Sequence, residues 1–174
     1  MLCSRMAWCR RDPEGLKLHF DENEVGLFHF LCRELKRLLE HGDFEQPAMT
    51  GFSPSLQRAG DPRAEAGELD EAMDRELMLF RLQRVEEVRG ELLAAAPEGE
   101  VPEEGVVLTL DLARADVWLA WLTDLRLLLG AVLGLSPEKP ESIDWDDPSS
   151  WTMEERMYLF LSELQEMMLA KMGG

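Results

Sequence analysis

Cysteine is scarce in this chain and comes as an odd number of residues: Cys3, Cys9 and Cys32. So small a set cannot form the disulfide framework on which small secreted domains depend, and it is typical of a reducing compartment. Residues 1–13 contain no continuous apolar stretch, so we expect no signal peptide there. These two absences predict a cytoplasmic protein.

Long hydrophobic runs are also absent. The most apolar segment, residues 117–135, carries Asp124 and Arg126 near its middle. Each of these charges would cost roughly 2.5–3.5 kcal/mol at the centre of a bilayer. We therefore expect no contact with a membrane and interpret this segment as a helix buried in protein.

Positive charge is in the minority, because Lys and Arg number 18 against 35 Asp and Glu, for a net charge of -17. Such a field repels phosphate backbones and anionic membranes and favours cationic partners. The composition is otherwise that of a globular protein, with 45% hydrophobic and 30% charged residues. At 174 residues the chain is long enough for one core, and we expect a single helical domain over residues 1–174.

The pattern that is present is mostly helical. Residues 6–9 and 16–20 predict two strands, and the turn residues Asp12-Pro13-Glu14-Gly15 join them as a β-hairpin within residues 1–20. Apolar spacing predicts helices between Asp21 and Gly42, over 68–96 (one helix, or two joined at a bend), from Asp111 to about residue 133, and from Thr152 to residue 171. Residues 106–110 predict a third strand that pairs with the hairpin. The expected fold is mainly α, in the α+β class: a bundle of four to five helices with a small N-terminal hairpin and one further strand.

Three segments rich in Gly, Pro, Ser or acidic residues, 43–67, 97–105 and 136–150, are expected to be loops. Asp21 with Glu24, and Thr152 with Glu155, have the spacing of a capping box and predict where the first and last helices begin. Gly134, followed by a proline, predicts the end of the third helix.

That third helix is apolar on nearly every face, which predicts a buried helix. Asp124 and Arg126 lie inside it, and both need partners because an unpaired buried charge is costly. They point about 200° apart on the helix, so we expect each to bond to another element. The pair is interpreted as a structural clamp in the core that fixes helix packing; the alternative is an ion pair that binds a ligand. Gly130 and Gly134 are expected to let another element approach closely.

Cys3 and Cys9 suggest a redox switch. On one extended strand their α-carbons would lie about 20 Å apart, whereas a disulfide needs roughly 5.5 Å. They can therefore bridge only if the first six residues fold back. Arg5, Arg10 and Arg11 are near in sequence and are expected to lower the thiol pKa.

Metal-binding and catalytic patterns are missing from the sequence. The acidic cluster Asp144, Asp146 and Asp147 lacks the spacing of a calcium loop. His29 and Cys32 lie one helical turn apart, but two further ligands are not evident. We expect no enzyme activity, no metal and no cofactor.

Basic residues concentrate in the first third of the chain. They form a candidate contact surface, which we call the basic set: Arg5, Arg10, Arg11, Lys17, Arg33, Lys36 and Arg37. If the chain contacts DNA directly, this set is the expected surface, although the net charge disfavours such binding. The alternative is an ordinary solvated face, balanced by Glu34 and Glu40.

The run Trp121-Leu122-Thr123-Asp124-Leu125-Arg126-Leu127-Leu128-Leu129-Gly130 resembles the signature of an actinobacterial family, domain of unknown function 2017. In the last helix, Tyr158, Leu161, Leu164 and Gln165 are similar to the closing pattern of that family. Thr123 stands where the family usually has asparagine, and the segment after Gly60-Asp61-Pro62 lacks the family's usual continuation.

The resemblance implies a cytoplasmic protein with no recognised enzyme activity. Some members of the family are labelled oxidative-stress transcriptional regulators that work with a stress sigma factor, which implies redox-linked regulation by protein contact with a sigma factor or polymerase. Family genes tend to lie near those of the Clp-protease adaptor, so an accessory role in Clp-type proteolysis is the alternative. A homodimer is compatible with both. A third hypothesis, an enzyme of unrecognised type, requires a pocket that holds Asp124, Arg126 and a histidine.

Overall fold

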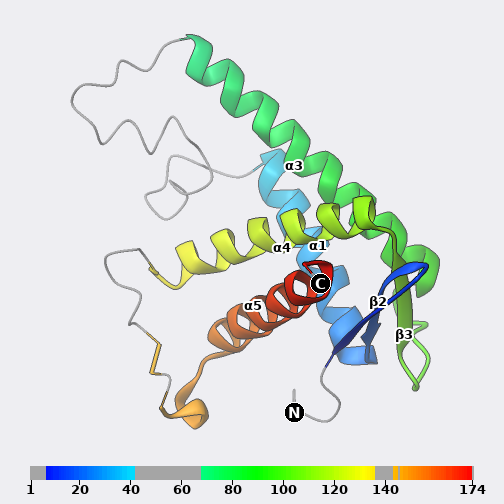
Figure 1. Ribbon diagram of the computed structural model, residues 1–174. Helices are drawn as coiled ribbons and strands as arrows, with labels where there is room; N and C mark the ends of the chain where they lie inside the picture. The colour runs from blue at the N-terminus through cyan, green and yellow to red at the C-terminus, as the bar shows by residue number, and fades with distance from the viewer. Residues whose placement is uncertain (1–6, 42–67, 136–142, 145, 174) are drawn as a thin grey trace.

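The computed structural model describes residues 7–41, 68–135, 143–144 and 146–173 (Figure 1). Their elements follow in the order β1 (Trp8–Asp12), β2 (Gly15–Phe20), α1 (Glu22–His41), α3 (Glu68–Ala95), β3 (Val106–Leu110), α4 (Leu112–Val132), the short 3₁₀-helix η3 (Pro148–Ser150) and α5 (Met153–Met172). The described part thus has four α-helices and one three-stranded sheet, which confirms the mainly helical α+β fold. The expected loop at 43–67 lies outside the described residues, as does most of that at 136–150.

The sheet is antiparallel, with strand order β1-β2-β3. Its hairpin turns at Pro13 and Glu14, and Asp12 pairs with Gly15. Strand β1 therefore runs to Asp12, later than the sequence predicted, because a two-residue turn leaves the residues before Pro13 free to pair. Gly15 has φ +139, and a Cβ there would collide with the carbonyl oxygen of Leu110 on β3, so this position requires glycine.

Helix α1 begins with the predicted capping box. The backbone N–H of Glu24 donates to Asp21 Oδ1 at 2.9 Å, and the N–H of Asp21 donates to Glu24 Oε2 at 2.8 Å. The inner face of α1 buries apolar side chains at helical spacing: Val25, Phe28, Leu31, Cys32, Leu35 and Leu39. These side chains pack on the buried face of β2 and on α3, so α1 links the sheet to the helical bundle.

Helix α3 is one continuous helix, and its first turns extend beyond the ends of the other helices (Figure 1). Among its described side chains, those of Arg81, Val85, Val88 and Leu92 are buried. Phe80, by contrast, is 55% exposed. Residues 97–105 form the predicted loop between α3 and β3. Gly99 and Gly105 have positive φ in its turns.

Helix α4 lies between α3 and α5 and packs against both (Figure 1). Its two tryptophans, Trp118 and Trp121, are fully buried, and their rings lie 5.3 Å apart at the centre of an aromatic cluster with Phe20 and Phe28. The expectation of burial on nearly all faces was wrong, since Leu127 and Val132 are 41% and 61% exposed. The apolar side chains of Leu127 and Val132 therefore have no covering neighbour among the described residues.

The end of α4 is set by Gly134, which has φ +66 and bonds to the carbonyl of Ala131. Among the described residues, the close approach expected at Gly130 and Gly134 is not present: a Cβ on Gly130 would make ordinary contact with Tyr158, and one on Gly134 would meet no described atom within 4 Å. Gly134 therefore serves as a helix stop rather than a packing site.

Helix α5 closes the bundle and begins with the second predicted capping box, in which Thr152 and Glu155 exchange hydrogen bonds. It buries Leu161, Leu164 and Met168 against α4, while Met153 stays 58% exposed. Among the described helices, none combines the length and apolar character needed to cross a membrane.

Candidate functional site

The first polar cluster joins α3 to α4 around Asp124. Its carboxylate accepts a hydrogen bond from Arg81 Nε at 3.1 Å and one from Arg84 Nη1 at 2.6 Å. Asp124 and Arg81 are 4% and 6% exposed, whereas the Arg84 side chain is 23% exposed. Burial raises the pKa of Asp124, although both guanidiniums lower it, and burial lowers the pKa of Arg81. The geometry is that of a polar clamp between two helices.

The second polar cluster joins α4 to α5 on another side of α4. Arg126 Nη1 donates to Gln165 Oε1 at 2.6 Å, and Gln165 Nε2 donates to Thr123 Oγ1 at 2.7 Å. The Arg126 guanidinium also lies 5.4 Å from the ring centroid of Tyr158, within range of a cation–π contact. Asp124 and Arg126 thus bond to different helices, as their spacing implies, and the motif residues of α4 and α5 contact one another.

A third cluster extends the contact between α3 and α4. Arg114 bonds to Glu91 and to Glu87, the latter at 3.0 Å, and the Trp118 indole N–H donates to Glu91 Oε2. Sequence reasoning missed the partners on α3, Arg81 and Arg84 above all. Their three-residue spacing, in line with the buried Val85 and Val88, was the signal that could have found them.

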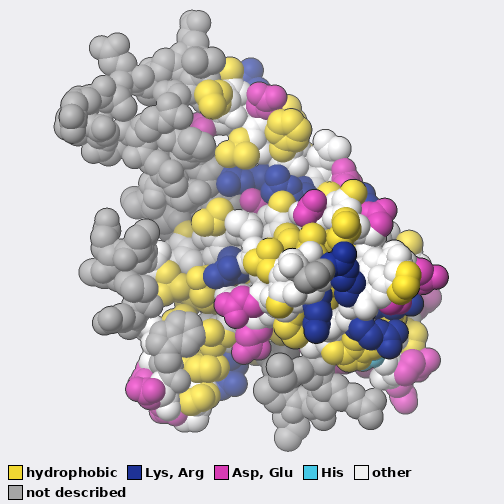
Figure 2. Space-filling view, in the orientation of Figure 1, with side chains coloured by type: hydrophobic (Ala, Val, Ile, Leu, Met, Phe, Trp, Pro, Cys, Tyr) yellow, Lys and Arg dark blue, Asp and Glu magenta, His cyan; other side chains and the backbone are white. Residues whose placement is uncertain are grey.

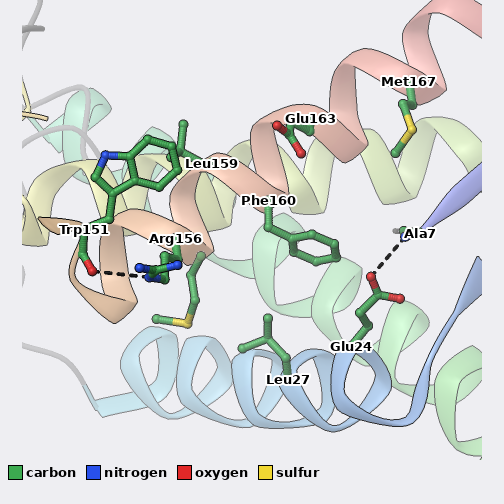
Figure 3. A pocket seen from close by; sticks show the side chains of 10 residues that line it. Ala7, Glu24, Leu27, Trp151, Arg156, Leu159, Phe160, Glu163 and Met167 are labelled. Atoms are coloured by element: carbon green, nitrogen blue, oxygen red, sulfur yellow. Dashed lines mark hydrogen bonds between the residues drawn. The ribbon is translucent and has the colours of Figure 1, made fainter. Parts of the chain in front are cut away.

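A cleft of about 240 Å³ lies between α1 and α5. Leu27 of α1 and Phe160 of α5 point toward each other across it (Figure 3). Met157, Leu159 and Met167 add apolar side chains to the lining. The Phe160 ring packs on that of Phe28 at 5.8 Å, which anchors the wall of the cleft to the core. Most of the lining side chains are apolar. They come mainly from α1, which packs mostly on α3, and from α5, which packs mostly on α4.

The two ends of the cleft differ in charge (Figure 3). At one end Arg156 is held by backbone carbonyls, with Nη2 donating to Pro148 at 2.9 Å and Nε to Trp151 at 3.3 Å. At the other end the buried Glu24 accepts from the backbone N–H of Ala7 at 3.1 Å, in addition to its bond in the capping box. Burial raises the pKa of Glu24, and these backbone hydrogen bonds partly offset the increase. Glu163 lies exposed on the rim.

The cysteines do not form a reactive site in the described part of the chain. Cys3 and Arg5 lie outside the described residues. Burial raises the pKa of the Cys9 thiol, and Lys171 only partly lowers it, so the expected lowering by arginines was wrong for Cys9. Adjacent strand residues point to opposite faces, which takes Arg10 away from Cys9, and Arg11 instead donates to the carbonyls of Lys171 and Met172. Cys32 is buried, which raises its pKa to about 12.

Most described members of the basic set are neutralised by acidic neighbours. Lys17 pairs with Asp12 and Glu14, Arg33 with Glu98, Lys36 with Glu40 and Glu86, and Arg37 with Glu34. Arg10 lies over the ring of Trp8 at 5.9 Å, on the strand that also carries Arg11. The basic set is therefore divided between a helix face and the hairpin, and most of it is ion-paired.

The histidines are also separated. His19 Nε2 lies 2.9 Å from the Glu104 carbonyl oxygen, and His29 Nε2 lies 2.9 Å from that of Ala96. Within the described residues, no group of three His, Cys, Asp or Glu side chains could hold a metal ion. Neither Asp124, Arg126 nor any histidine lines the cleft.

These observations define a small, mainly helical α+β protein. Its polar motif residues join neighbouring helices, and an apolar cleft opens on its described surface. The chain belongs to the family described as "Domain of unknown function (DUF2017)", which matches residues 6–172. This confirms the family that the motif residues indicated. No solved structure matches the chain significantly.

Curated relatives include the "Oxidative stress regulator AosR" of Mycobacterium bovis and of two strains of Mycobacterium tuberculosis. Each is 34% identical to this chain over 74 residues, which are 42% of this chain and 33% of the relative. The match thus spans about a third of the length of these curated relatives.

Proposed function

We propose that this chain is a non-enzymatic regulator that acts by binding another protein, in redox-linked control of transcription. The observation that carries the proposal is the similarity to relatives named oxidative stress regulators. We propose a sigma factor or polymerase as the partner, in the cytoplasm.

The geometry supports a binding role over a catalytic one. The titratable motif residues Asp124 and Arg126 are bonded to neighbouring helices instead of converging on one pocket. The cleft between α1 and α5 is lined mainly by apolar side chains, which suit recognition of a partner segment. The net charge of -17 favours a cationic partner surface over a phosphate backbone.

The redox element of the proposal is a linkage between Cys3 and Cys9. Its test is peptide mapping by mass spectrometry after mild peroxide treatment. A peptide that joins the two cysteines supports the switch, and its absence at doses that activate the cellular response rules out a switch of this kind.

The partner is tested by affinity capture from the host with and without oxidant. Enrichment of a sigma factor or polymerase supports the proposal, whereas recovery of a Clp adaptor or chaperone alone replaces it with an accessory role in proteolysis. Titration with duplex DNA at two salt concentrations is the companion test. Tight, strongly salt-dependent binding would contradict regulation by protein contact alone.

A further inference from the structure

The cleft between α1 and α5 is a mostly apolar site, and none of its lining residues belongs to the polar clusters around α4. Its walls are well supported, since Phe160 rests on Phe28 and Leu27 extends from the same helix as Phe28. Two of its lining residues are Met157 and Met167, whose flexible side chains adapt to different apolar shapes. A site of this kind suits an apolar side chain of a partner.

The volume of the cleft indicates the size of what enters it. At about 240 Å³ it is smaller than the roughly 300–1,000 Å³ of pockets that enclose a drug-sized ligand. It is larger than a cavity of about 150 Å³ that accommodates benzene. The cleft therefore fits one large apolar side chain, such as Leu, Phe or Met, better than a whole cofactor.

The charges around the cleft indicate the sign of the occupant. Glu24 and Glu163 contribute two carboxylates, while Arg156, the one cation among the described lining residues, already donates to two backbone carbonyls. A carboxylate has about four acceptor sites, and the hydrogen bonds that Glu24 accepts from the backbone N–H groups of Ala7 and Asp21 leave room for another donor. Figure 2 shows acidic side chains beside apolar surface over α5, with Lys and Arg side chains also nearby. The cleft thus favours an occupant that carries a cation next to its large apolar side chain, and it disfavours an anionic lipid or nucleic acid.

We infer that the cleft between α1 and α5 binds an amphipathic segment of a partner protein, with one large apolar side chain between Leu27 and Phe160 and an adjacent Lys or Arg at Glu163. This inference rests on the proposed function, because it names the surface that makes the regulatory contact. It also explains why the described residues of this acidic chain leave an apolar cleft open: the carboxylates select the partner by charge, and the cleft fixes its register.

The probe for this inference is a short fluorescein-labelled peptide of Leu, Lys and Ala with helical amphipathic spacing, followed by fluorescence anisotropy. A scrambled peptide of the same composition controls for charge alone, and a peptide with Ala in place of every Leu controls for the anchor. We expect saturable binding of the amphipathic peptide, and affinity lower by about tenfold or more for the Ala peptide. Equal binding of the scrambled peptide would overturn the inference.

Variants of the protein locate the binding. Leu159→Ser is expected to weaken the affinity by about tenfold, and Glu163→Lys by about fivefold at low salt, with the second effect shrinking as salt is added. Matched controls on α3, which contributes no residue to the cleft, are Leu79→Ser and Glu76→Lys; both side chains are exposed there. Cleft variants that bind the peptide with the same affinity as their α3 controls would overturn the inference. Occupation of the cleft by a second copy of the chain would also overturn it, and would appear as a concentration-dependent mass that Leu159→Ser abolishes.

The same variants separate this inference from the proposed function. If Leu159→Ser and Glu163→Lys still capture the cellular partner as the wild type does, the regulatory function stands and the cleft is not its docking site. If peptide binding follows the pattern above but no transcription partner is captured, the cleft assignment stands and the proposed function fails.

Discussion

Removal of the Asp124 carboxylate is the most informative single change. Asp124→Ala leaves two guanidiniums without their shared partner, and the two differ in how well water can replace it. Arg84 is partly exposed and can turn outward, whereas Arg81 is 6% exposed and cannot. Breaking a buried ion pair from one side costs about 3–5 kcal/mol. Asp74 also acts favourably on Arg81, so we expect about 3 kcal/mol, the lower end of that range.

The assay is urea denaturation followed by circular dichroism and by tryptophan fluorescence, to which the buried Trp118 and Trp121 of α4 contribute. Asp116→Ala, at an exposed site on the same helix, is the matched control and should stay within about 0.5 kcal/mol. The double variant Asp124→Leu with Arg81→Met should recover most of the loss, because it removes both buried charges. A loss below about 1 kcal/mol for Asp124→Ala, or no recovery in the double variant, would refute the clamp.

Three further predictions follow from the structure. Gln165→Ala should lower the free energy of unfolding by about 1–3 kcal/mol, because the half-buried Arg126 loses its acceptor and the exposed Thr123 loses a donor; chemical denaturation measures this, and an unchanged midpoint would argue against the contact. Gly15→Ala should destabilise the hairpin by about 1–3 kcal/mol through its positive φ and the nearby Leu110 carbonyl, visible as a lower Tm, whereas a wild-type Tm would show that the turn tolerates a side chain. Since the pKa of Cys32 is raised to about 12, its thiolate fraction is very small at pH 8; iodoacetamide at that pH should leave Cys32 unmodified in native protein and modify it in urea, and rapid native labelling would contradict its burial.

Local features of the fold could be predicted from the sequence because their causes are local. The capping boxes at Asp21 and Thr152 follow from side chains three residues apart, and the structure forms both. The turn before Gly15 and the strand at 106–110 were also recognisable from a few neighbouring residues. The error in β1 had a local cause too, since the turn type sets where pairing begins.

The remaining features depend on which helices and strands pack against one another, and no single segment of the sequence determines this. Helix α4 was predicted to be buried on nearly every face, yet Leu127 and Val132 are exposed because no described neighbour reaches them. The same holds for the cleft, which exists because α1 and α5 pack mainly on different partners. For Cys9, nearby arginines in the sequence proved a poor guide, since burial of the strand face dominates the thiol pKa.

The central claim is that the motif residues of α4 hold helices together and that function resides in contact with a partner. The most direct test is the transcriptional response to oxidant in a host strain that lacks this gene, complemented with the stable double variant Asp124→Leu, Arg81→Met. We predict a response equal to that of the wild-type gene, because the double variant keeps the packing of α3 on α4 without the charges. A folded, normally abundant double variant that fails to restore the response would show that the charges themselves act in the function.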